Sequence, residues 1–274
     1  MRRGKRMSGL LILALLLSLA GAARGEMYVE GYMGGNFSAP SSDPYLVQPD
    51  PTWNAAAFRP NLPGAIDPAF HGGLKIGTWF VKEGVLGFDY PEWMKYLGFY
   101  TDFSYHRLDF RKQYGSKTVA FGMSGVPTAP TAYPVTAFSH GYAITWAFMF
   151  AARCGFLPDQ EVPFGRLQPY LAVGPAILWS GQKGKATSWL PAFPTATKTD
   201  ELGPDSRVDV ALVVETGLRW MALKNVSIDV SFKYRYAQPT YKFGVIDEEG
   251  GVHRVNLDPT FHLFSFQVGA AYHF

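Results

Sequence analysis

The stretch FHLFSFQVGAAYHF, residues 261–274, decides the fold class that this sequence predicts. Counting back in twos from Phe274 gives side chains that are mostly apolar or aromatic, whereas the alternate set is mostly small or polar. Leu263 and Phe261 are the exceptions in the second set. Since a repeat of two residues is the repeat of a β-strand, the stretch predicts a strand with two unlike faces that ends on an aromatic residue.

The beginning of the chain has the three parts of a secretory signal peptide. Basic residues are followed by the apolar stretch LLILALLLSLA, residues 10–20, and then by small residues up to Gly25. The apolar stretch is much shorter than the roughly 20 residues of a membrane-spanning helix. We therefore expect residues 1–25 to be a cleaved signal peptide, with cleavage after Ala22 or Ala23 as the alternative, and residues 26–274 to form a single domain.

The charge of the chain changes when the expected signal peptide is removed. The full sequence has a formal net charge of +3, with 25 basic and 22 acidic residues. Acidic residues outnumber basic ones in the remainder, because the expected signal peptide contains Arg2, Arg3, Lys5, Arg6 and Arg24. The basic balance of the full sequence therefore gives no reason to expect a nucleic-acid partner.

The composition favours a membrane barrel over a soluble enzyme. Aromatic residues make up 16% of the chain and charged residues only 17%, against about 25% charged residues in ordinary soluble domains. No apolar run after residue 25 is long enough for a membrane-spanning helix. Because only helices and closed barrels satisfy every backbone polar group in lipid, a closed barrel is the membrane structure that remains. The single Cys154 cannot form an internal disulfide.

Eight segments alternate in the same way. In residues 225–237, apolar side chains such as Val230 and Phe232 fall on one face, and Asp229 and Lys233 fall on the other. Apolar residues outside and small or polar residues inside are typical of a barrel strand in lipid, whereas a soluble barrel shows the reverse. We expect an all-β, eight-stranded antiparallel up-and-down transmembrane barrel, with strands at residues 27–37, 70–82, 96–111, 138–153, 166–180, 208–221, 225–237 and 260–274.

The connections between these strands alternate between long and short. The long ones are expected to be external loops and the short ones periplasmic turns, as in outer-membrane barrels. An even number of strands then places both termini in the periplasm. The expected external loops are residues 38–69, 112–137, 181–207 and 238–259. Proline is frequent in residues 38–69, 126–134 and 189–197 and blocks ladder pairing, so we expect these stretches not to extend the sheet.

Two interpretations of the external loops remain open. In the first, the loops are stiff, solvated connectors. In the second, they form a binding surface for an external ligand, with Trp53, Tyr133 and Trp189 as exposed contacts.

Four stretches, MYVEGYMGGNF (residues 27–37), QPYLAVGPA (residues 168–176), residues 215–236 and residues 261–274, resemble the small eight-stranded barrels of the OmpA/OmpX type. This is the broad superfamily of outer-membrane β-barrel domains, and the resemblance covers most of the mature chain. It implies a monomer in the bacterial outer membrane, surrounded by outer-membrane lipid and lipopolysaccharide. It also implies delivery by periplasmic chaperones and insertion by the barrel assembly machinery, for which Phe274 is the expected assembly signal.

Aromatic residues are expected to form two belts where the barrel meets the membrane interfaces. The predicted belt residues near the periplasmic strand ends are Trp79, Trp93, Trp220, Tyr272 and Phe274, and those toward the external side are Trp179 and Tyr236.

The interior of an eight-stranded barrel is just wide enough for side chains to fill it. Both charge signs occur at the inward positions, so we expect a packed network of ion pairs and hydrogen bonds, because buried charges need partners. The alternative is a narrow path for ions or small solutes. The predicted inward residues are Glu30, Lys75, Asp102, His106, Arg153, Glu215, Arg219, Asp229, Lys233, Arg235 and Gln267.

An enzyme that modifies lipid A is the third alternative, since some small outer-membrane barrels have that activity. Ser104, His106 and Asp102 share one face of a predicted strand and form the one catalytic-looking row in the sequence. A polar stripe along the lumen explains the row equally well. No metal-ligand spacing, phosphate-binding loop or nucleophile elbow occurs in the sequence. We therefore expect no catalytic residue, no metal and no cofactor, and a structural, surface-interaction or small-solute role.

Overall fold

The computed structural model describes residues 26–39, 57–60, 66–81, 90–119, 122–123, 126–127, 131–190, 193–246 and 252–274. The expected signal peptide, most of the predicted loop 38–69 and the candidate contact Trp53 lie outside these residues. Within the described ranges, no helix has both the length and the apolar character needed to cross a membrane.

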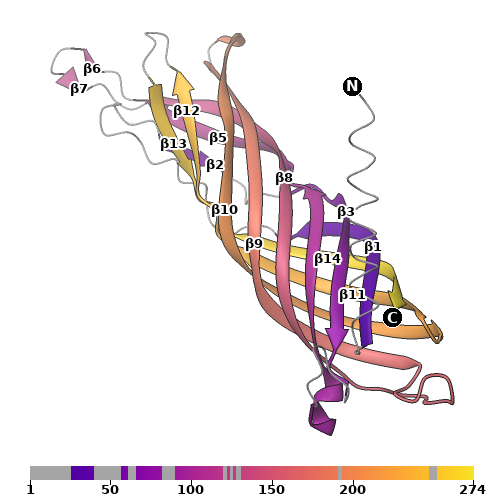
Figure 1. The fold of residues 1–274 in the computed structure, drawn as a ribbon. Coiled ribbons are helices and arrows are strands. Elements are labelled where there is room, and N and C mark those ends of the chain that lie inside the picture. The colour runs from indigo at the N-terminus through magenta and orange to yellow at the C-terminus, as the bar shows by residue number, and fades with distance from the viewer. Residues whose placement is uncertain are drawn as a thin grey trace, which may run out of the picture.

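Eight antiparallel strands form a closed barrel in which each strand pairs with its neighbours along the chain (Figure 1). The predicted eight-stranded, up-and-down β-barrel is therefore confirmed. The barrel strands are β1 (Glu26–Ser38), β3 (Ala69–Trp79), β4 (Leu97–Arg107), β8 (Thr131–Arg153), β9 (Leu167–Leu190), β10 (Phe193–Leu223), β11 (Val226–Ala237) and β14 (Phe261–His273).

The first and last strands close the barrel. In the β1–β14 ladder Tyr28 lies opposite His273 and Ser38 lies opposite Leu263. A glycine is required at position 34, because a Cβ atom there would lie 1.8 Å from the backbone oxygen of Phe266. This close approach draws the two strands together in the middle of the closing ladder.

Both described ends of the chain, Glu26 and Phe274, lie at one end of the barrel, which we call the terminal end. The backbone N–H of Phe274 donates to the backbone oxygen of Met27 over 2.9 Å. The connections at this end are the two-residue turn Lys224–Asn225, the longer turn 154–166, and the segment between β3 and β4 that contains the 3-10 helix η2 (Glu92–Tyr96).

The turn 154–166 is held by its own polar groups. Asp159 accepts hydrogen bonds from the backbone N–H groups of Glu161 and Val162, over 3.0 Å and 2.7 Å, and forms an ion pair with Arg166. The Val162 hydrogen bond and then the Arg166 hydrogen bond hold the pKa of Asp159 below its ordinary value. Gly165 has a φ of 125°, a conformation that suits glycine.

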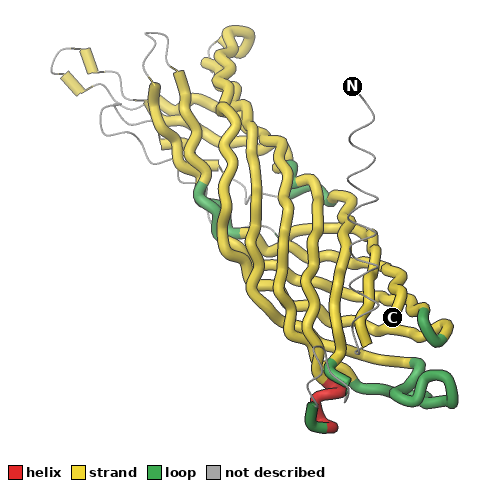
Figure 2. Tube along the Cα trace, in the orientation of Figure 1, coloured by secondary structure: helices red, strands yellow, loops and turns green. Residues whose placement is uncertain are grey.

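The sheet continues far beyond the other end of the barrel, which we call the extended end (Figures 1 and 2). β9 and β10 remain paired as far as Leu190 and Phe193, and β8 pairs with β5 (Phe110–Val119), which in turn pairs with β2 (Ala57–Pro60). We call β2, β5 and residues 131–140, 181–190 and 193–207 the sheet extension. Separate hairpins are formed by β12 (Tyr241–Ile246) with β13 (Val252–Leu257), and by β6 (Gly122–Met123) with β7 (Val126–Pro127).

The sheet extension corrects one expectation. Residues 38–69, 126–134 and 189–197 were expected not to extend the sheet. Each nevertheless contributes strand to it, through β2, the start of β8, and the ends of β9 and β10 that pair beyond the barrel. Pro194 and Pro204 lie in β10 where its register with β9 shifts, so the ladder tolerates a residue without an N–H there. Pro134 lies within β8, opposite Ser116 of β5. Proline therefore interrupts these ladders locally without ending the strands.

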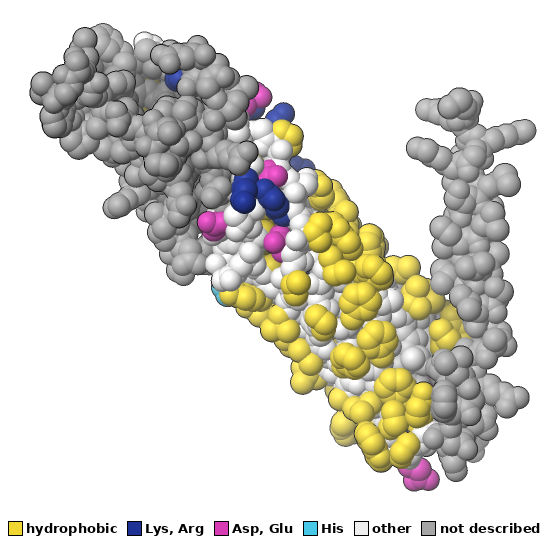
Figure 3. All heavy atoms as spheres, turned by 60° about the vertical axis from the view of Figure 1, so that its left-hand side comes forward, with side chains coloured by type: hydrophobic (Ala, Val, Ile, Leu, Met, Phe, Trp, Pro, Cys, Tyr) yellow, Lys and Arg dark blue, Asp and Glu magenta, His cyan; other side chains and the backbone are white. Residues whose placement is uncertain are grey.

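The outer wall of the barrel is apolar (Figure 3). Hydrophobic side chains gather over the strands, and charged side chains lie beyond them toward the extended end. We call the exposed apolar residues of the wall the apolar belt. It includes Phe70, Leu74, Phe103, Phe150, Leu171, Val173, Val210, Leu212, Leu218, Trp220, Val230, Phe266 and Val268.

Candidate functional site

All eleven residues that the sequence predicts to face inward are buried in the barrel lumen, each with at most 2% of its surface exposed. They come from seven of the eight strands, and the alternation of each strand turns them toward the barrel axis. The lumen is therefore the largest group of buried charged side chains among the described residues, and it is the first candidate site.

Lys75 is the centre of the lumen network. Its Nζ lies 2.8 Å from Oε1 of Glu30, 2.6 Å from Oε1 of Glu215 and 4.0 Å from Oδ1 of Asp229. β3 and β10 are separated by three strands in either direction around the barrel. The bond from Lys75 to Glu215 therefore spans the lumen from one wall to the opposite wall.

A second bond crosses the lumen in the same manner. Lys233 of β11 forms an ion pair with Asp102 of β4, on the opposite wall, and lies 3.4 Å from Glu215. Arg219 completes the network with contacts of 2.6 Å to Glu30 and 3.4 Å to Asp229. Buried charges are unfavourable unless they are paired, so these ion pairs allow many charged side chains to be buried in the lumen.

Tyrosine side chains extend the network, and the sequence prediction missed them. Tyr100 donates to Glu215 over 3.1 Å, Tyr170 donates to Glu215 over 2.9 Å and to Asp229 over 2.8 Å, and Tyr32 donates to Asp102. Their positions relative to predicted lumen residues were the available signal. Tyr32 is two residues from Glu30 and Tyr100 two residues from Asp102, so each shares an inward face.

At the terminal end, Arg153 lies between aromatic rings. Its guanidinium is 4.2 Å from the ring centre of Trp79 and 4.1 Å from that of Phe164, and Nη1 donates to Glu26 over 2.8 Å and to Gln168 over 3.0 Å. This site is a cation–π stack with a carboxylate partner.

The position of Trp79 corrects the belt prediction. Trp79 is only 2% exposed and faces the lumen, where its ring stacks on Tyr28. The reason is strand alternation, since Trp79 lies four residues after the inward Lys75. The other predicted belt residues lie on the outside: Trp93, Trp220, Tyr272 and Phe274 are exposed, and Trp179 and Tyr236 are half-buried.

Toward the extended end, the polar network gives way to buried apolar side chains. Phe110 and Phe261 pack with their ring centres 6.1 Å apart, and Tyr241 donates to Ser180 over 2.7 Å. Leu263 and Phe261, the exceptions in the alternation of the last strand, belong to this group. We call it the apolar cap; its residues are Ile66, Leu108, Phe110, Tyr241, Phe243, Phe261 and Leu263, each at most 7% exposed.

Arg235 and His106 lie between the network and the apolar cap. Arg235 donates to Asn36 over 2.7 Å and to Ser265 over 2.5 Å, and no described carboxylate lies within 4.0 Å of it. His106 contacts Asn36 over 3.5 Å, and Gln267 contacts Glu215 and Ser231. Arg235 is thus held by neutral partners, unlike the other buried cations of the lumen.

The catalytic-looking row does not form a triad. Asp102 is bound by Lys233 and Tyr32, and Nδ1 of His106 lies 2.9 Å from the backbone oxygen of Arg107. No hydrogen bond joins Ser104 to His106 in the described part of the chain. Nor does that part contain a group of three or more His, Cys, Asp or Glu residues arranged to hold a metal ion.

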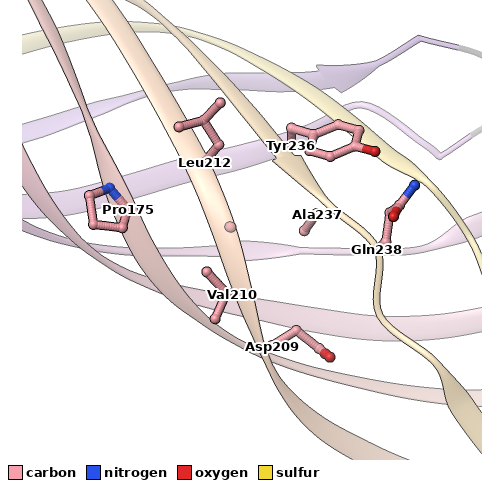
Figure 4. A pocket seen from close by; sticks show the side chains of 8 residues that line it. Pro175, Asp209, Val210, Leu212, Tyr236, Ala237 and Gln238 are labelled. Atoms are coloured by element: carbon pink, nitrogen blue, oxygen red, sulfur yellow. The ribbon is translucent and has the colours of Figure 1, made fainter.

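A pocket of about 390 Å³, which we call the wall pocket, lies in the barrel wall along β10, between the neighbouring strands β9 and β11 (Figure 4). The β10–β11 ladder ends at the pair Ala211 and Ala237, where β11 itself ends and the chain continues into Gln238. The pocket is lined by Pro175, Asp209, Val210, Ala211, Leu212, Tyr236, Ala237 and Gln238. No sequence signal indicated this pocket, because it depends on where two ladders end.

Two candidate external contacts fall on the sheet extension. Tyr133 lies in β8 opposite Lys117 of β5, and Trp189 lies in β9 opposite Thr197 of β10, with a half-buried side chain.

No known family model matches this sequence, and no curated protein matches it. Solved structures with a similar arrangement include the outer membrane protein OprG from Pseudomonas aeruginosa, at 12% identity over 92% of this chain and 97% of that chain, with a TM-score of 0.42. Neisserial surface protein A matches at 13% identity over 90% and 97%, with a TM-score of 0.34.

Ail, the attachment invasion locus protein of Yersinia pestis, in complex with a heparin analogue, matches at 16% identity over 91% of this chain and 99% of that chain, with a TM-score of 0.34. At such identities and TM-scores these matches say nothing about activity.

Proposed function

We propose that this chain is an integral outer-membrane barrel that is blocked to solute flow and acts through its sheet extension at the cell surface. The observation that carries this proposal is the length of the strands. β9 has 24 residues and β10 has 31, whereas a strand needs only about 9–11 residues to cross a membrane. The excess forms the sheet extension, which stands clear of the apolar belt.

The apolar belt supports a place in the membrane. Exposed side chains such as Phe266 (57%) and Val230 (48%) alternate with buried polar ones along the same strands, which is the pattern of a lipid-embedded barrel. In this placement lipid and lipopolysaccharide surround the belt, and the terminal end, with both termini, faces the periplasm. Residues 1–25 direct export, and the barrel assembly machinery and periplasmic chaperones insert a monomer.

The lumen supports a blocked barrel over the narrow channel. The ion pairs Lys75–Glu215 and Lys233–Asp102 join opposite walls, and the apolar cap adds a second barrier. An ion would have to break the paired charges and then cross buried aromatic side chains, both of which are unfavourable. The enzyme alternative receives no support, since Asp102 and His106 are engaged with other partners.

Labelling tests the placement. In intact cells, a membrane-impermeant maleimide should label Thr197→Cys in a Cys154→Ser background, because residue 197 is exposed on the sheet extension. The native Cys154, exposed in the turn at the terminal end, should react only after the outer membrane is opened. Labelling of Cys154 in intact cells would contradict this orientation.

Conductance tests the blocked lumen. The purified, folded protein should give no stable channel in planar lipid bilayers. A steady single-channel current of nanosiemens size would overturn the proposal. A different conductance in a Lys75→Met variant would then assign that current to the lumen.

A further inference from the structure

The wall pocket lies where the surface of β10 changes character. Leu212 and Val210 belong to the apolar belt, with 47% and 79% of their surfaces exposed. A few residues further along β10, Arg207 and Asp205 form an ion pair at 2.8 Å. In the proposed membrane placement, this change from apolar to charged residues marks the level of the lipid head groups, so the pocket has access to both environments.

The pocket also lies at a gap in the hydrogen-bonded wall. Beyond Ala211 and Ala237, no described backbone pair continues the ladder from β10 toward the chain that follows β11. β12 approaches β10 through a side chain instead, since the backbone N–H of Lys242 donates to Oδ2 of Asp205 over 2.7 Å. Between these two points the wall is open enough to hold a ligand, and about 390 Å³ is within the range of roughly 300–1,000 Å³ for small-molecule pockets.

Asp209 is the one charged residue of the lining. Its Oδ2 is buried without a hydrogen-bond partner. Among the described residues, no lysine, arginine or histidine nitrogen lies within 4.0 Å of either of its carboxylate oxygens. Asp205 and Asp229 differ from it in that each has an arginine nitrogen within 4.0 Å. A buried acceptor without a donor is unfavourable, and a ligand that supplies a donor would remove that penalty.

The rest of the lining is suited to an alkyl chain. Pro175, Val210 and Leu212 come from β9 and β10, and Tyr236 comes from β11, the strand that pairs with β10 (Figure 4). The pocket therefore joins one unpaired negative charge to an apolar surface that is continuous with the belt.

From this pairing we propose that the wall pocket binds an amphiphile with a primary ammonium head, which donates to Asp209 while its chain lies on Pro175, Val210, Leu212 and Tyr236. The head supplies the hydrogen bond and the positive charge that Asp209 lacks. The chain keeps its contact with the apolar belt, and the head reaches through the gap in the wall to Asp209, which lies on the same inward face of β10 as Ala211 and Val213. The site rests on the proposed membrane placement, although its chemistry can be tested separately.

Calorimetric titration of the full mature chain in phosphatidylcholine nanodiscs tests the site, with dodecylamine as the probe and empty nanodiscs subtracted. The wild type should bind dodecylamine in excess of the lipid background. Asp209→Asn, which keeps the side-chain shape and removes the charge, should weaken this binding about tenfold or more, as expected for loss of one charge-assisted hydrogen bond. Binding of dodecanol should differ little between the two proteins.

Glu201→Gln is the matched control. Glu201 lies on the same strand, outside the pocket, and is already paired with Lys185 at 2.8 Å, so its substitution should leave dodecylamine binding unchanged. Exchange of part of the phosphatidylcholine for phosphatidylethanolamine should weaken dodecylamine binding if a lipid head group occupies the site. An unchanged affinity would assign the site to a free amphiphile.

Equal binding by wild type and Asp209→Asn, or no binding above the nanodisc background, would overturn the proposal. Heat-modifiable migration of both proteins on a gel shows that the variant is folded. A failure of the proposed surface orientation would instead be detected by the labelling of Cys154, which does not depend on the pocket.

Discussion

Nζ of Lys75 lies 2.6 Å from Oε1 of Glu215 and joins two opposite walls of the barrel. Both side chains are fully buried, and Glu30 contacts the same ammonium group at 2.8 Å. Lys75→Met would leave these two carboxylates without their shared cation. We expect a loss of about 3–5 kcal/mol in the free energy of unfolding, the usual effect of breaking a buried pair from one side. Urea titration of the folded protein in detergent measures it.

Arg235→Met is the control for this prediction. Arg235 is buried to a similar degree, but its partners are Asn36 and Ser265, and these two can still bond each other, over 2.9 Å, when the arginine is removed. Its substitution should therefore cost much less than that of Lys75. If Arg235→Met proved as destabilising as Lys75→Met, charge pairing would not be what stabilises the lumen.

Gly34 provides a test of barrel closure. A Cβ atom at this position would lie 1.8 Å from the Phe266 backbone oxygen, whereas one at Gly31 on the same strand would have no atom within 4 Å. Gly34→Ala should push β1 away from β14 and destabilise the folded protein by about 1–3 kcal/mol. Gly31→Ala should be neutral or slightly stabilising. Thermal unfolding measures the stability of both variants. Equal effects of the two substitutions would show that the register between β1 and β14 is wrong.

Two tryptophans on opposite faces of the wall should respond differently to lipid. Trp220 is 51% exposed on the apolar belt, whereas Trp79 is 2% exposed and faces the lumen. In proteins that retain only one of the two, with the other tryptophans replaced by phenylalanine, brominated lipids should strongly quench the fluorescence of Trp220 and hardly affect that of Trp79. Comparable quenching of both tryptophans would show that Trp79 faces the lipid rather than the lumen.

The turn 154–166 should loosen in acid. The pKa of Asp159 is depressed by the hydrogen bond from Val162 and then by Arg166, so its contribution is present above the ordinary carboxyl value of 3.8 and is lost as the pH falls below it. Hydrogen-exchange protection of the Val162 amide should decrease over that range. Asp159→Asn keeps an acceptor oxygen but does not titrate, so in this variant the protection of the Val162 amide should not change over the same pH range.

Loss of Phe274 should affect assembly more than stability. The side chain is 39% exposed and packs on Tyr272 with a ring separation of 5.1 Å, so its deletion should lower the stability of refolded protein by less than about 2 kcal/mol. In cells, the fraction of heat-modifiable barrel should fall sharply if Phe274 is the assembly signal. Phe274→Tyr preserves the aromatic end and should assemble normally.

Strand alternation explains why the barrel could be predicted from the sequence. In β11, Asp229 and Lys233 face the lumen and Val230 faces outward, and the same repeat of two identifies the inward face of each strand. Trp79 could have been assigned correctly from the same repeat, since it shares the face of Lys75. Its aromatic character suggested an interfacial anchor, but local alternation determined its direction.

The sheet extension and the wall pocket were beyond the sequence prediction. Pro194 and Pro204 indicated loops, yet their missing N–H groups fall at register shifts in the ladder with β9. The pocket depends on where the ladder between β10 and β11 stops, at Ala211 and Ala237. The point at which a ladder ends depends on long-range pairing between strands, and no local sequence pattern around Asp209 indicates it.

The closing ladder has a consequence for how the barrel can be made. β1 carries a complete row of partners for β14, from Tyr28 opposite His273 to Ser38 opposite Leu263. β1 and β14 are the most widely separated strands in the chain, so their pairing has a large entropic cost of loop closure and is expected late in folding. Until β14 pairs with β1, one edge of β1 stays open and can pair with a strand from another chain. Any process that delays the last strand therefore prolongs the period in which this protein can aggregate.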